Sequence, residues 1–287
     1  MNGLALCSGY GGIELGLEHF FPQFKTICHV EGEAYAAAHL RKKMAEGRLH
    51  NAPIWDDVKT FDGSIWRGKV DIITGGFPCQ PFSSSGNRKG VEDERWLWPY
   101  ISKIIGEIRP QFFFFENVPN IALGGLDQIV RDIASLGYDA SWCVIGADNI
   151  GAPHQRKRWF IFGKDTNTEC LGWVKKQPAA PARKFDVERL CDEIPNSSGF
   201  DGNKISLQRK HTGWQKFSIN GEERRASQRM RNFLGHFEIE PELGRLVDGS
   251  PHWVDKLRLL GNGVVPQQAY FAICILWELL GGVEYES

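Results

Sequence analysis

The 287-residue sequence predicts an α/β fold in which a mostly parallel sheet is followed by a second, irregular domain. In the first half, short β-rich runs alternate with helical apolar periodicity, which is typical of a parallel sheet with crossover helices. Several of these runs end in glycine or an acidic residue, where open α/β sheets bind ligands. After Gly163 the apolar runs become rare and neither periodicity is clear.

Five buried strands are predicted in the first half from continuous apolar runs. They are residues 4–7, 26–30, 70–74, 111–115 and 159–162.

Helices are predicted where apolar side chains recur on one helical face. One such face holds Ile13, Leu17 and Phe20, and a second follows the isoleucines of residues 101–108. A helical pattern returns over residues 266–280. That last helix is long enough to pack back on the first domain.

Composition and charge indicate a globular chain of about two domains. Hydrophobic residues make up 42% and charged residues 24%, which excludes a disordered composition. With 34 Lys and Arg against 35 Asp and Glu, the net charge of −1 by itself gives no support for a nucleic-acid partner. Residues 204–231, however, hold eight basic and two acidic side chains. Such a stretch either binds phosphates or forms a solvated surface.

The seven cysteines are odd in number and include no C-x-x-C pair, so no disulfide framework and no metal site are predicted. Residues 1–12 lack the basic and apolar segments of a signal peptide. The longest apolar run, residues 269–277, is too short to cross a bilayer. We therefore expect a cytoplasmic protein with no membrane partner.

A glycine-rich turn at residues 7–12 follows the first strand and opens a helix. Its glycines allow a ligand to approach the backbone and leave the amides at the helix start free to donate. Glu31 lies 22 positions after Gly9, close to the spacing of about 20 at which a carboxylate accepts ribose hydroxyls. Together they indicate an adenosine-containing cofactor, with a plain tight turn as the alternative.

Cys79 lies between Pro78 and Pro81 in a loop that follows the third strand. A structural cysteine is normally buried in an apolar run, whereas a nucleophile lies on an accessible loop where its thiolate forms. The loop context therefore favours a nucleophile.

Glu116 follows the most apolar strand of the chain, residues 112–115. A carboxyl group at the end of a buried strand is poorly solvated, so we expect its pKa to be raised, as suits a proton donor at neutral pH. A solvated strand end with the turn-forming Asn117 is the alternative.

Residues 152–158 lead into the last predicted strand of the first half, and strand alternation puts His154, Arg156 and Arg158 on one face. Arginine donors suit carboxylates, phosphates and carbonyl oxygens. A solvated basic strand edge is the alternative.

In this order, the motifs resemble those of bacterial and phage cytosine-5 DNA methyltransferases. They are the glycine turn, Glu31, Asp57-Val58, Pro78-Cys79-Gln80, Glu116-Asn117-Val118, Arg156-x-Arg158 and Gly261-Asn262-Gly263-Val264. The resemblance covers about the first 164 and the last 30 residues, and its most specific parts are Pro-Cys-Gln and Glu-Asn-Val. The sequence departs from the family at Cys7, His154 and Gly263, where Phe, Gln and a small residue such as Ser are common.

This resemblance implies a Rossmann-like sheet that binds S-adenosylmethionine. The catalytic domain would comprise residues 1–164 plus 250–287, and a target-recognition domain residues 165–249. The implied partner is double-stranded DNA, from which the target cytosine flips out. The resemblance also implies a monomer and a restriction endonuclease counterpart.

The implied chemistry is covalent catalysis. Cys79 would attack ring carbon 6 of cytosine, Glu116 would hydrogen-bond or protonate ring nitrogen 3, and Arg158 would hold the carbonyl oxygen. Backbone carbonyls of Phe77 and Pro78 would read the exocyclic amine, and a base such as a water near Asn117 would remove the proton from carbon 5. The implied catalytic set is Cys79, Glu116, Arg158, Arg156, Asn117 and Pro78.

The implied cofactor contacts follow the same motifs. Glu31 would accept the ribose hydroxyls, and Asp57 would accept the adenine amine unless it simply begins an acidic helix. The set is Cys7, Ser8, Gly9, Tyr10, Gly11, Gly12, Glu31, Gly32, Asp57, Val58, Gly76, Pro78, Leu97, Asn262, Gly263 and Val264.

DNA contacts are expected from the cysteine loop and from the basic middle segment. The candidates are Gln80, Ser83, Lys204, Arg209, Lys210, Arg224, Arg225 and Arg229. Three alternatives remain open: a methyltransferase of the same motif set that acts on transfer RNA, a nicotinamide-dependent oxidoreductase, and a DNA-binding module without catalysis. The oxidoreductase hypothesis leaves the Pro-Cys-Gln and Glu-Asn-Val motifs without a role.

Overall fold

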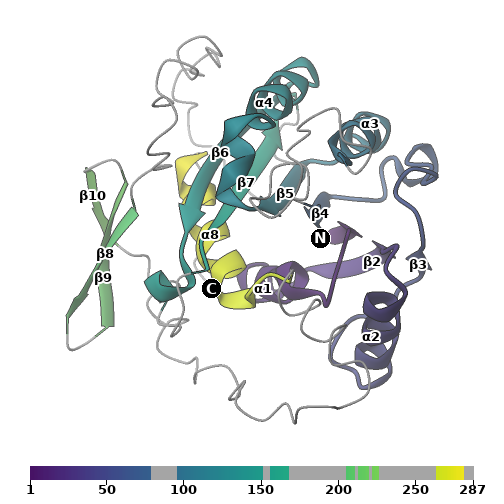
Figure 1. Ribbon diagram of the computed structural model, residues 1–287, viewed down its shortest axis with the longest axis horizontal. Helices are drawn as coiled ribbons and strands as arrows, with labels where there is room; N and C mark the ends of the chain where they lie inside the picture. Colours follow the sequence, from purple (N-terminus) through teal and green to yellow (C-terminus); the bar gives the residue numbers. More distant parts are fainter. Residues whose placement is uncertain are drawn as a thin grey trace.

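The computed structural model describes residues 1–78, 96–150, 156–167, 205–210, 213–219, 222–225 and 263–280. A seven-stranded sheet forms the centre of the molecule (Figure 1). Its strands are β1 (Asn2–Leu6), β2 (Lys25–Val30), β3 (Ile54–Trp55), β4 (Ile72–Gly76), β5 (Phe112–Asn117), β6 (Tyr138–Ile145) and β7 (Arg158–Asp165). The five predicted strands correspond to β1, β2, β4, β5 and β7, with ends that differ by three residues or fewer.

The strand order is β3-β2-β1-β4-β5-β7-β6. The pairs from β3 to β5 are parallel, and β7 runs antiparallel to both of its neighbours. The chain leaves β1 toward β2 and β3 on one side, then returns to place β4 on the other side of β1. This reversal makes a crevice at the carboxyl ends of β1 and β4, where open α/β sheets bind ligands. The predicted α/β class with a mostly parallel sheet is confirmed.

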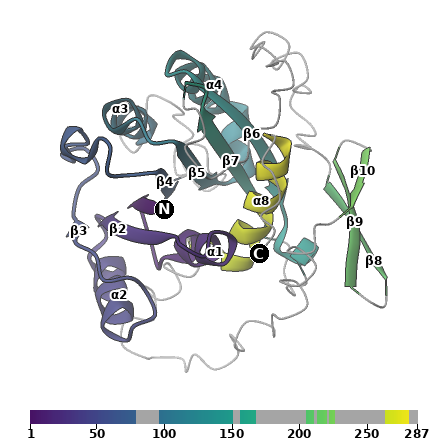
Figure 2. The same ribbon diagram turned by 180° about the vertical axis from the view of Figure 1, so that it is seen from behind.

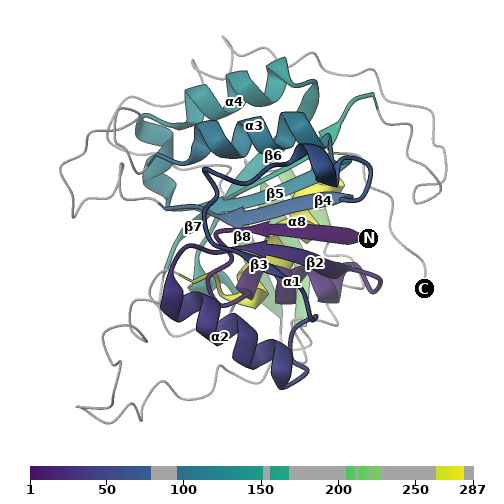
Figure 3. The same cartoon turned by 90° about the vertical axis from the view of Figure 1, so that its right-hand side faces the viewer.

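Helices cover both faces of the sheet. Figure 3 shows α3 and α4 on one face and α1 and α2 on the other. The helix α8 packs against α1 and shares its apolar cluster, so it lies on the same face as α1. The described helices are α1 (Gly12–Phe20), α2 (Ala34–Ala45), α3 (Trp98–Ile108), α4 (Leu126–Ser135) and α8 (Pro266–Leu279), with short 3-10 turns at η1 (Ser64–Trp66), η3 (Pro119–Leu123) and η4 (Ala147–Ile150). Among the described residues, no helix is long and apolar enough to cross a bilayer.

The aromatic strand β5 holds the two halves of the core together. Phe112 and Phe114 pack with the α1 and α8 side, whereas Phe113 and Phe115 pack with the α3 and α4 side. Phe114 stacks on Phe160 of β7 with ring centroids 5.7 Å apart. Truncating one such fully buried ring to alanine typically costs about 3–5 kcal/mol. The end of β5, where Glu116 lies, is therefore rigidly placed.

The terminal helix α8 packs against α1, as the sequence predicts for residues 266–280 (Figure 2). Gly16 on α1 allows this contact, because a Cβ there would lie 2.7 Å from the Pro266 carbonyl oxygen. The packing brings residues 263–265, which precede α8, beside the glycine turn that precedes α1.

A second sheet lies within the segment for which the sequence shows no strand period. Its three strands are β8 (Ile205–Lys210), β9 (Gly213–Ile219) and β10 (Glu222–Arg225), antiparallel in the order β10-β9-β8. For these residues, the absence of an alternating apolar pattern in the sequence therefore does not mean the absence of strands. The register between β8 and β9 shifts at Gln208/Arg209, and such a bulge breaks the alternation of apolar and polar residues.

Candidate active site

A cavity of about 230 Å³ lies at the carboxyl ends of β1, β4 and β5. Its walls include twelve of the site residues predicted from the sequence: Cys7, Ser8, Gly9, Gly12, Glu31, Gly76, Pro78, Glu116, Asn117, Arg158, Gly263 and Val264. Motifs that are far apart in the chain therefore meet at the crevice that the strand order creates. The site occupies the position expected of a ligand site in this class of sheet.

The glycine turn after β1 forms one wall of the cavity. Positive φ angles at Cys7 (50°), Gly9 (54°) and Gly11 (85°) turn the backbone sharply before α1 begins. A side chain on Gly12 would overlap the carbonyl oxygen of Val264, so glycine is required where the two segments touch. Burial raises the pKa of the Cys7 thiol to about 12, and the Glu31 carboxylate adds to this rise. Cys7 is therefore not a nucleophile at neutral pH.

Glu31 closes the cavity on the β2 side. Its carboxylate accepts the backbone N–H of Gly9 at 2.7 Å and that of Glu33 at 2.8 Å. Burial raises its pKa, and these two hydrogen bonds oppose the rise. Each carboxylate oxygen keeps further acceptor capacity, which suits a diol such as a ribose.

Glu116 stands at the end of β5 and is only 4% exposed. Burial raises its pKa to about 7, while the guanidinium groups of Arg158 and Arg156 oppose the rise. Arg158 Nε lies 2.7 Å from Glu116 Oε1. Since β7 runs antiparallel to β5, the first residue of β7 lies beside the end of β5, which explains this pairing. The expectation of a raised pKa at Glu116 agrees with the geometry.

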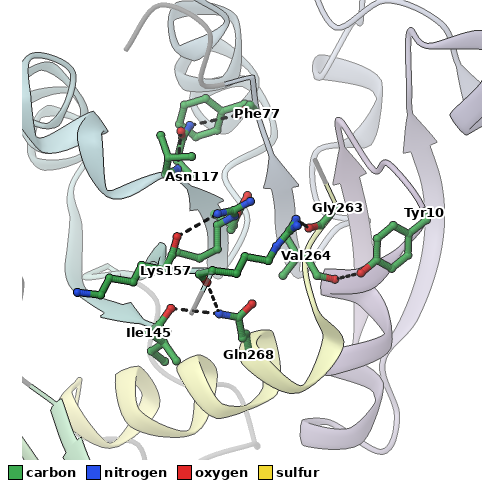
Figure 4. Close-up of polar contacts among 12 residues, drawn as sticks. Tyr10, Phe77, Asn117, Ile145, Lys157, Gly263, Val264 and Gln268 are labelled. Atoms are coloured by element: carbon green, nitrogen blue, oxygen red, sulfur yellow. Dashed lines mark hydrogen bonds and ion pairs between the residues drawn. The ribbon is translucent and has the colours of Figure 1, made fainter. Parts of the chain in front are cut away.

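The expected strand alternation of His154, Arg156 and Arg158 is wrong. β7 begins only at Arg158, and Arg156 has a φ of 22°, so the extended pattern does not reach back to it. Arg156 instead donates to the carbonyl of Gly263, and Tyr10 donates to the carbonyl of Val264 next to it (Figure 4). The segment before α8 is thus held from both sides, while His154 lies outside the described residues.

Asn117 links the end of β5 to the start of the cysteine loop, which follows β4. Its Nδ2 donates to the carbonyl of Phe77 at 3.1 Å, and its Oδ1 accepts the N–H of Val118 at 2.8 Å (Figure 4). The Phe77 carbonyl, expected to read an exocyclic amine, already accepts one hydrogen bond. Its second lone pair stays available for a ligand.

Gln268 in the first turn of α8 holds the two ends of the connection between β6 and β7. Its Nε2 donates to the Ile145 carbonyl at 3.1 Å and to the Arg156 carbonyl at 2.9 Å (Figure 4). Gln268 is fully buried. This side chain therefore anchors the backbone that carries the arginine pair.

We expect Gln268→Leu to lower the free energy of unfolding by about 3 kcal/mol, because two buried carbonyls lose their donor. The measurement is urea unfolding followed by circular dichroism. Gln267→Leu, one residue earlier on α8, is the matched control and is expected to change the value by less than about 1 kcal/mol. Equal stability of Gln268→Leu and the unchanged protein would contradict this anchoring role.

Several predicted site residues do not line the cavity. Asp57 accepts the backbone N–H of Lys59 at 2.9 Å and begins a turn rather than a helix. Seven predicted site residues are described by the structure but do not line the cavity: Tyr10, Gly11, Gly32, Asp57, Val58, Leu97 and Arg156. Tyr10 and Arg156 nevertheless support the wall through the segment before α8.

Other predicted residues lie outside the described part of the chain. They are Cys79, Gln80, Ser83, Lys204, Arg229 and Asn262. Arg209 and Lys210 lie on β8, and Arg224 and Arg225 on β10, where the structure describes the backbone only. Their roles stay predictions.

The cavity walls also contain residues that the sequence motifs did not select. They are Ile13, Glu14, Glu33, Ala36 and Gly75, together with Val118, which belongs to the Glu-Asn-Val motif but was given no role, and Phe77, which was expected only through its carbonyl. A signal for Glu14 was present: it lies three residues before Leu17, on the buried face of α1. Within the described residues, no cluster of His, Cys, Asp and Glu could hold a metal ion.

Acidic groups dominate the electrostatics of the cavity. Four acidic side chains line its described walls, those of Glu14, Glu31, Glu33 and Glu116, against the single guanidinium of Arg158. Burial raises the pKa of Glu14 and of Glu116 to about 7, so these two are partly ionised at neutral pH. Such a site favours a cationic ligand and disfavours one that carries several phosphates. The sulfonium and ammonium groups of S-adenosylmethionine fit this charge, whereas the pyrophosphate of a nicotinamide dinucleotide does not.

Comparison with known proteins identifies relatives across most of the chain. The family model described as C-5 cytosine-specific DNA methylase matches residues 1–240. Type II methyltransferase M.PspPI of Psychrobacter sp. (strain TA137) is 37% identical over 210 residues, which cover 68% of this chain and 48% of that protein. Type II methyltransferase M.CviJI of Paramecium bursaria Chlorella virus IL3A is 34% identical over 189 residues, covering 64% of this chain and 48% of that protein. The chain thus spans about half the length of these curated relatives.

Solved structures support the fold. The crystal structure of the S. pombe Dnmt2 methyltransferase matches with a TM-score of 0.57 and 17% sequence identity, over 98% of this chain and 99% of that one. At this identity, the likeness establishes the shared fold alone.

Proposed function

Because the chain belongs to the C-5 cytosine-specific DNA methylase family, we propose that it transfers a methyl group from S-adenosylmethionine to carbon 5 of a cytosine in double-stranded DNA. The observation that carries this proposal is the meeting of Glu116, Arg158 and Pro78 in one cavity with the glycine turn. Pro78 is followed directly in the sequence by Cys79. This arrangement supports a single site for the proton donor and the cofactor turn, to which the proposal adds Cys79 as the nucleophile.

In this proposal, the Cys79 thiolate forms a bond to carbon 6 of the flipped base, which makes carbon 5 nucleophilic. Glu116 gives its proton to ring nitrogen 3, so negative charge does not build up on the ring. When bound, S-adenosylmethionine supplies the electrophilic methyl group that carbon 5 takes up. A base then removes the proton from carbon 5, and the bond between sulfur and carbon 6 breaks to release the thiolate.

Arg158 would share its guanidinium between Glu116 and the carbonyl oxygen of the base. Its Nε bond to Glu116 leaves the guanidinium other N–H donors for a second acceptor. Arg156 acts on the cavity wall, because it donates to the Gly263 carbonyl. Its proposed role is therefore to position that wall rather than to touch the base.

The cavity suits S-adenosylmethionine as the methyl donor. Glu31 would accept its ribose hydroxyls, and Gly9 leaves open space where a side chain would otherwise stand. Gly263 and Val264 also line the cavity, where Val264 touches the glycine turn at Gly12. The acidic lining disfavours the nicotinamide alternative.

The middle segment, residues 165–249, is the proposed target-recognition domain of this enzyme. Its charge of +6 over residues 204–231, from eight basic and two acidic side chains, suits the DNA backbone. A monomeric state, a cytoplasmic location and a restriction endonuclease counterpart stay predictions from the sequence.

The decisive experiment offers tritiated S-adenosylmethionine with either duplex plasmid DNA or transcribed transfer RNA. We expect label in the DNA, and bisulfite sequencing of that DNA should locate 5-methylcytosine at a recurring sequence. Label in the RNA alone would replace the proposed substrate by RNA. Binding of DNA with no methyl transfer to either polymer would favour the non-catalytic alternative.

A further inference from the structure

Glu14 is a buried acidic side chain of the cavity to which the proposed mechanism gives no role. It lies in the first turn of α1, is 1% exposed and lines the cavity. Its Oε1 accepts the hydroxyl of Thr74 on β4 at 2.6 Å. Its Oε2 is buried and has no hydrogen-bond partner among the described residues.

The other carboxylates of the described walls are engaged. Glu31 accepts two backbone N–H groups, and Glu33 caps α2 by accepting the N–H of Ala36 at 3.3 Å. Glu116 is paired with Arg158. Glu14 Oε2 is therefore the buried carboxyl oxygen of the described walls that has no hydrogen-bond partner. Burial raises the pKa of this carboxyl group to about 7, so its ionised form is stable only when a donor or a positive charge lies beside it.

The position of Glu14 in the site identifies which part of a ligand it would meet. Glu31 follows β2, whereas Glu14 is bonded to β4, the strand that leads to Pro78. A ligand whose ribose lies at Glu31 and whose reactive centre lies toward β4 therefore directs its amino-acid end past the start of α1. That end carries one cation and one anion, an ammonium and a carboxylate.

We propose that Glu14 binds the α-ammonium group of the cofactor's amino-acid end through Oε2. The inference rests on the proposed use of S-adenosylmethionine. An ammonium supplies the missing donor and the missing positive charge together, a combination that neither a water molecule nor a hydroxyl provides. The Thr74 hydroxyl holds the other carboxylate oxygen, so the acceptor is oriented before the ligand binds.

The test measures binding by titration calorimetry, with no turnover and no DNA. The ligands are S-adenosylhomocysteine, its deaminated analogue, which keeps the carboxylate, and 5′-methylthioadenosine, which lacks the amino-acid end. For the unchanged protein, we expect the deaminated analogue to bind at least tenfold more weakly than S-adenosylhomocysteine. Equal affinity for these two ligands would overturn the proposal without any variant.

The protein side of the test uses Glu14→Gln, which keeps the side-chain shape and an acceptor for Thr74. We expect it to bind S-adenosylhomocysteine at least tenfold more weakly, with affinity for 5′-methylthioadenosine unchanged within twofold. Glu18→Gln is the matched control, because Glu18 is one turn later on α1, pairs with His50 and does not line the cavity. It should bind all three ligands as the unchanged protein does.

The outcomes separate the two levels of inference. If the unchanged protein binds S-adenosylhomocysteine but Glu14→Gln binds it equally well, the role of Glu14 is wrong and the proposed function stands. If Glu14→Gln loses all three ligands equally, the residue is structural and the proposal again fails. If the unchanged protein binds none of the three ligands, the proposed cofactor itself is wrong.

Discussion

Cys79→Ala is expected to abolish methyl transfer, with a fall in rate of at least about a thousandfold, while duplex DNA and S-adenosylhomocysteine still bind. The physical reason is that carbon 5 of cytosine is a weak nucleophile until a thiolate adds to carbon 6. Of the four cysteines that the structure describes, only Cys7 lines the cavity, and it is not suited to this step. Cys7, the thiol that lines the cavity, has its pKa raised to about 12 by burial and by Glu31.

The covalent step has its own readout. In duplex DNA that contains 5-fluorocytosine, the fluorine on carbon 5 cannot leave as a proton does, so the bond between sulfur and carbon 6 persists after methylation. Denaturing electrophoresis and mass spectrometry should show a protein–DNA adduct for the unchanged protein and none for Cys79→Ala.

Cys143→Ala provides the matched control for this substitution. Cys143 is fully buried in β6, and burial raises the pKa of its thiol far above the usual range. The control should therefore form the adduct normally. An adduct that survives in Cys79→Ala would show that the nucleophile has been misassigned.

The sequence predicts the parts of the fold that carry continuous apolar runs. β5 is recognisable because residues 112–115 are four consecutive phenylalanines. In the structure all four are buried, two on each face of the sheet. β6 was missed because it pairs only with β7 at the edge of the sheet, and its buried and partly exposed residues alternate. α2 was missed because its buried face consists of small residues and Leu40, which give a weak helical signal.

The sequence predicts site residues whose motif directly follows a strand. It predicts less well the side-chain partners that depend on how distant segments pack together. The Glu116 and Arg158 pairing follows from the antiparallel register of β5 and β7, which no local spacing reveals. Arg156 shares its motif yet turns to Gly263, because its backbone leaves the strand conformation. Gln268 carries no motif at all, and its role arises only when α8 packs beside the connection between β6 and β7.

Glu116→Gln is expected to lower the rate of methyl transfer by roughly 10²–10⁴-fold, the range typical for removal of a general acid. Glutamine keeps a hydrogen-bond donor of similar shape but has no proton to transfer to ring nitrogen 3. Because the change leaves Arg158 without its carboxylate partner, binding of S-adenosylhomocysteine and of DNA is measured beside the rate. Both should be retained, and Glu46→Gln, an exposed change after α2, should leave rate and binding unaffected.

The pH dependence separates proton transfer from charge pairing as the role of Glu116. Burial raises its pKa to about 7, so the carboxyl group is protonated below this value and loses its proton as the pH rises through it. If the protonated form is the donor, kcat/KM of the unchanged protein contains a component that falls as the pH rises above about 7. Glutamine does not titrate, so Glu116→Gln should lose this alkaline decline and keep the rise that thiolate formation at Cys79 produces. An alkaline decline that is identical in the two proteins would show that another group supplies the proton, and Glu116 would then serve only to hold Arg158.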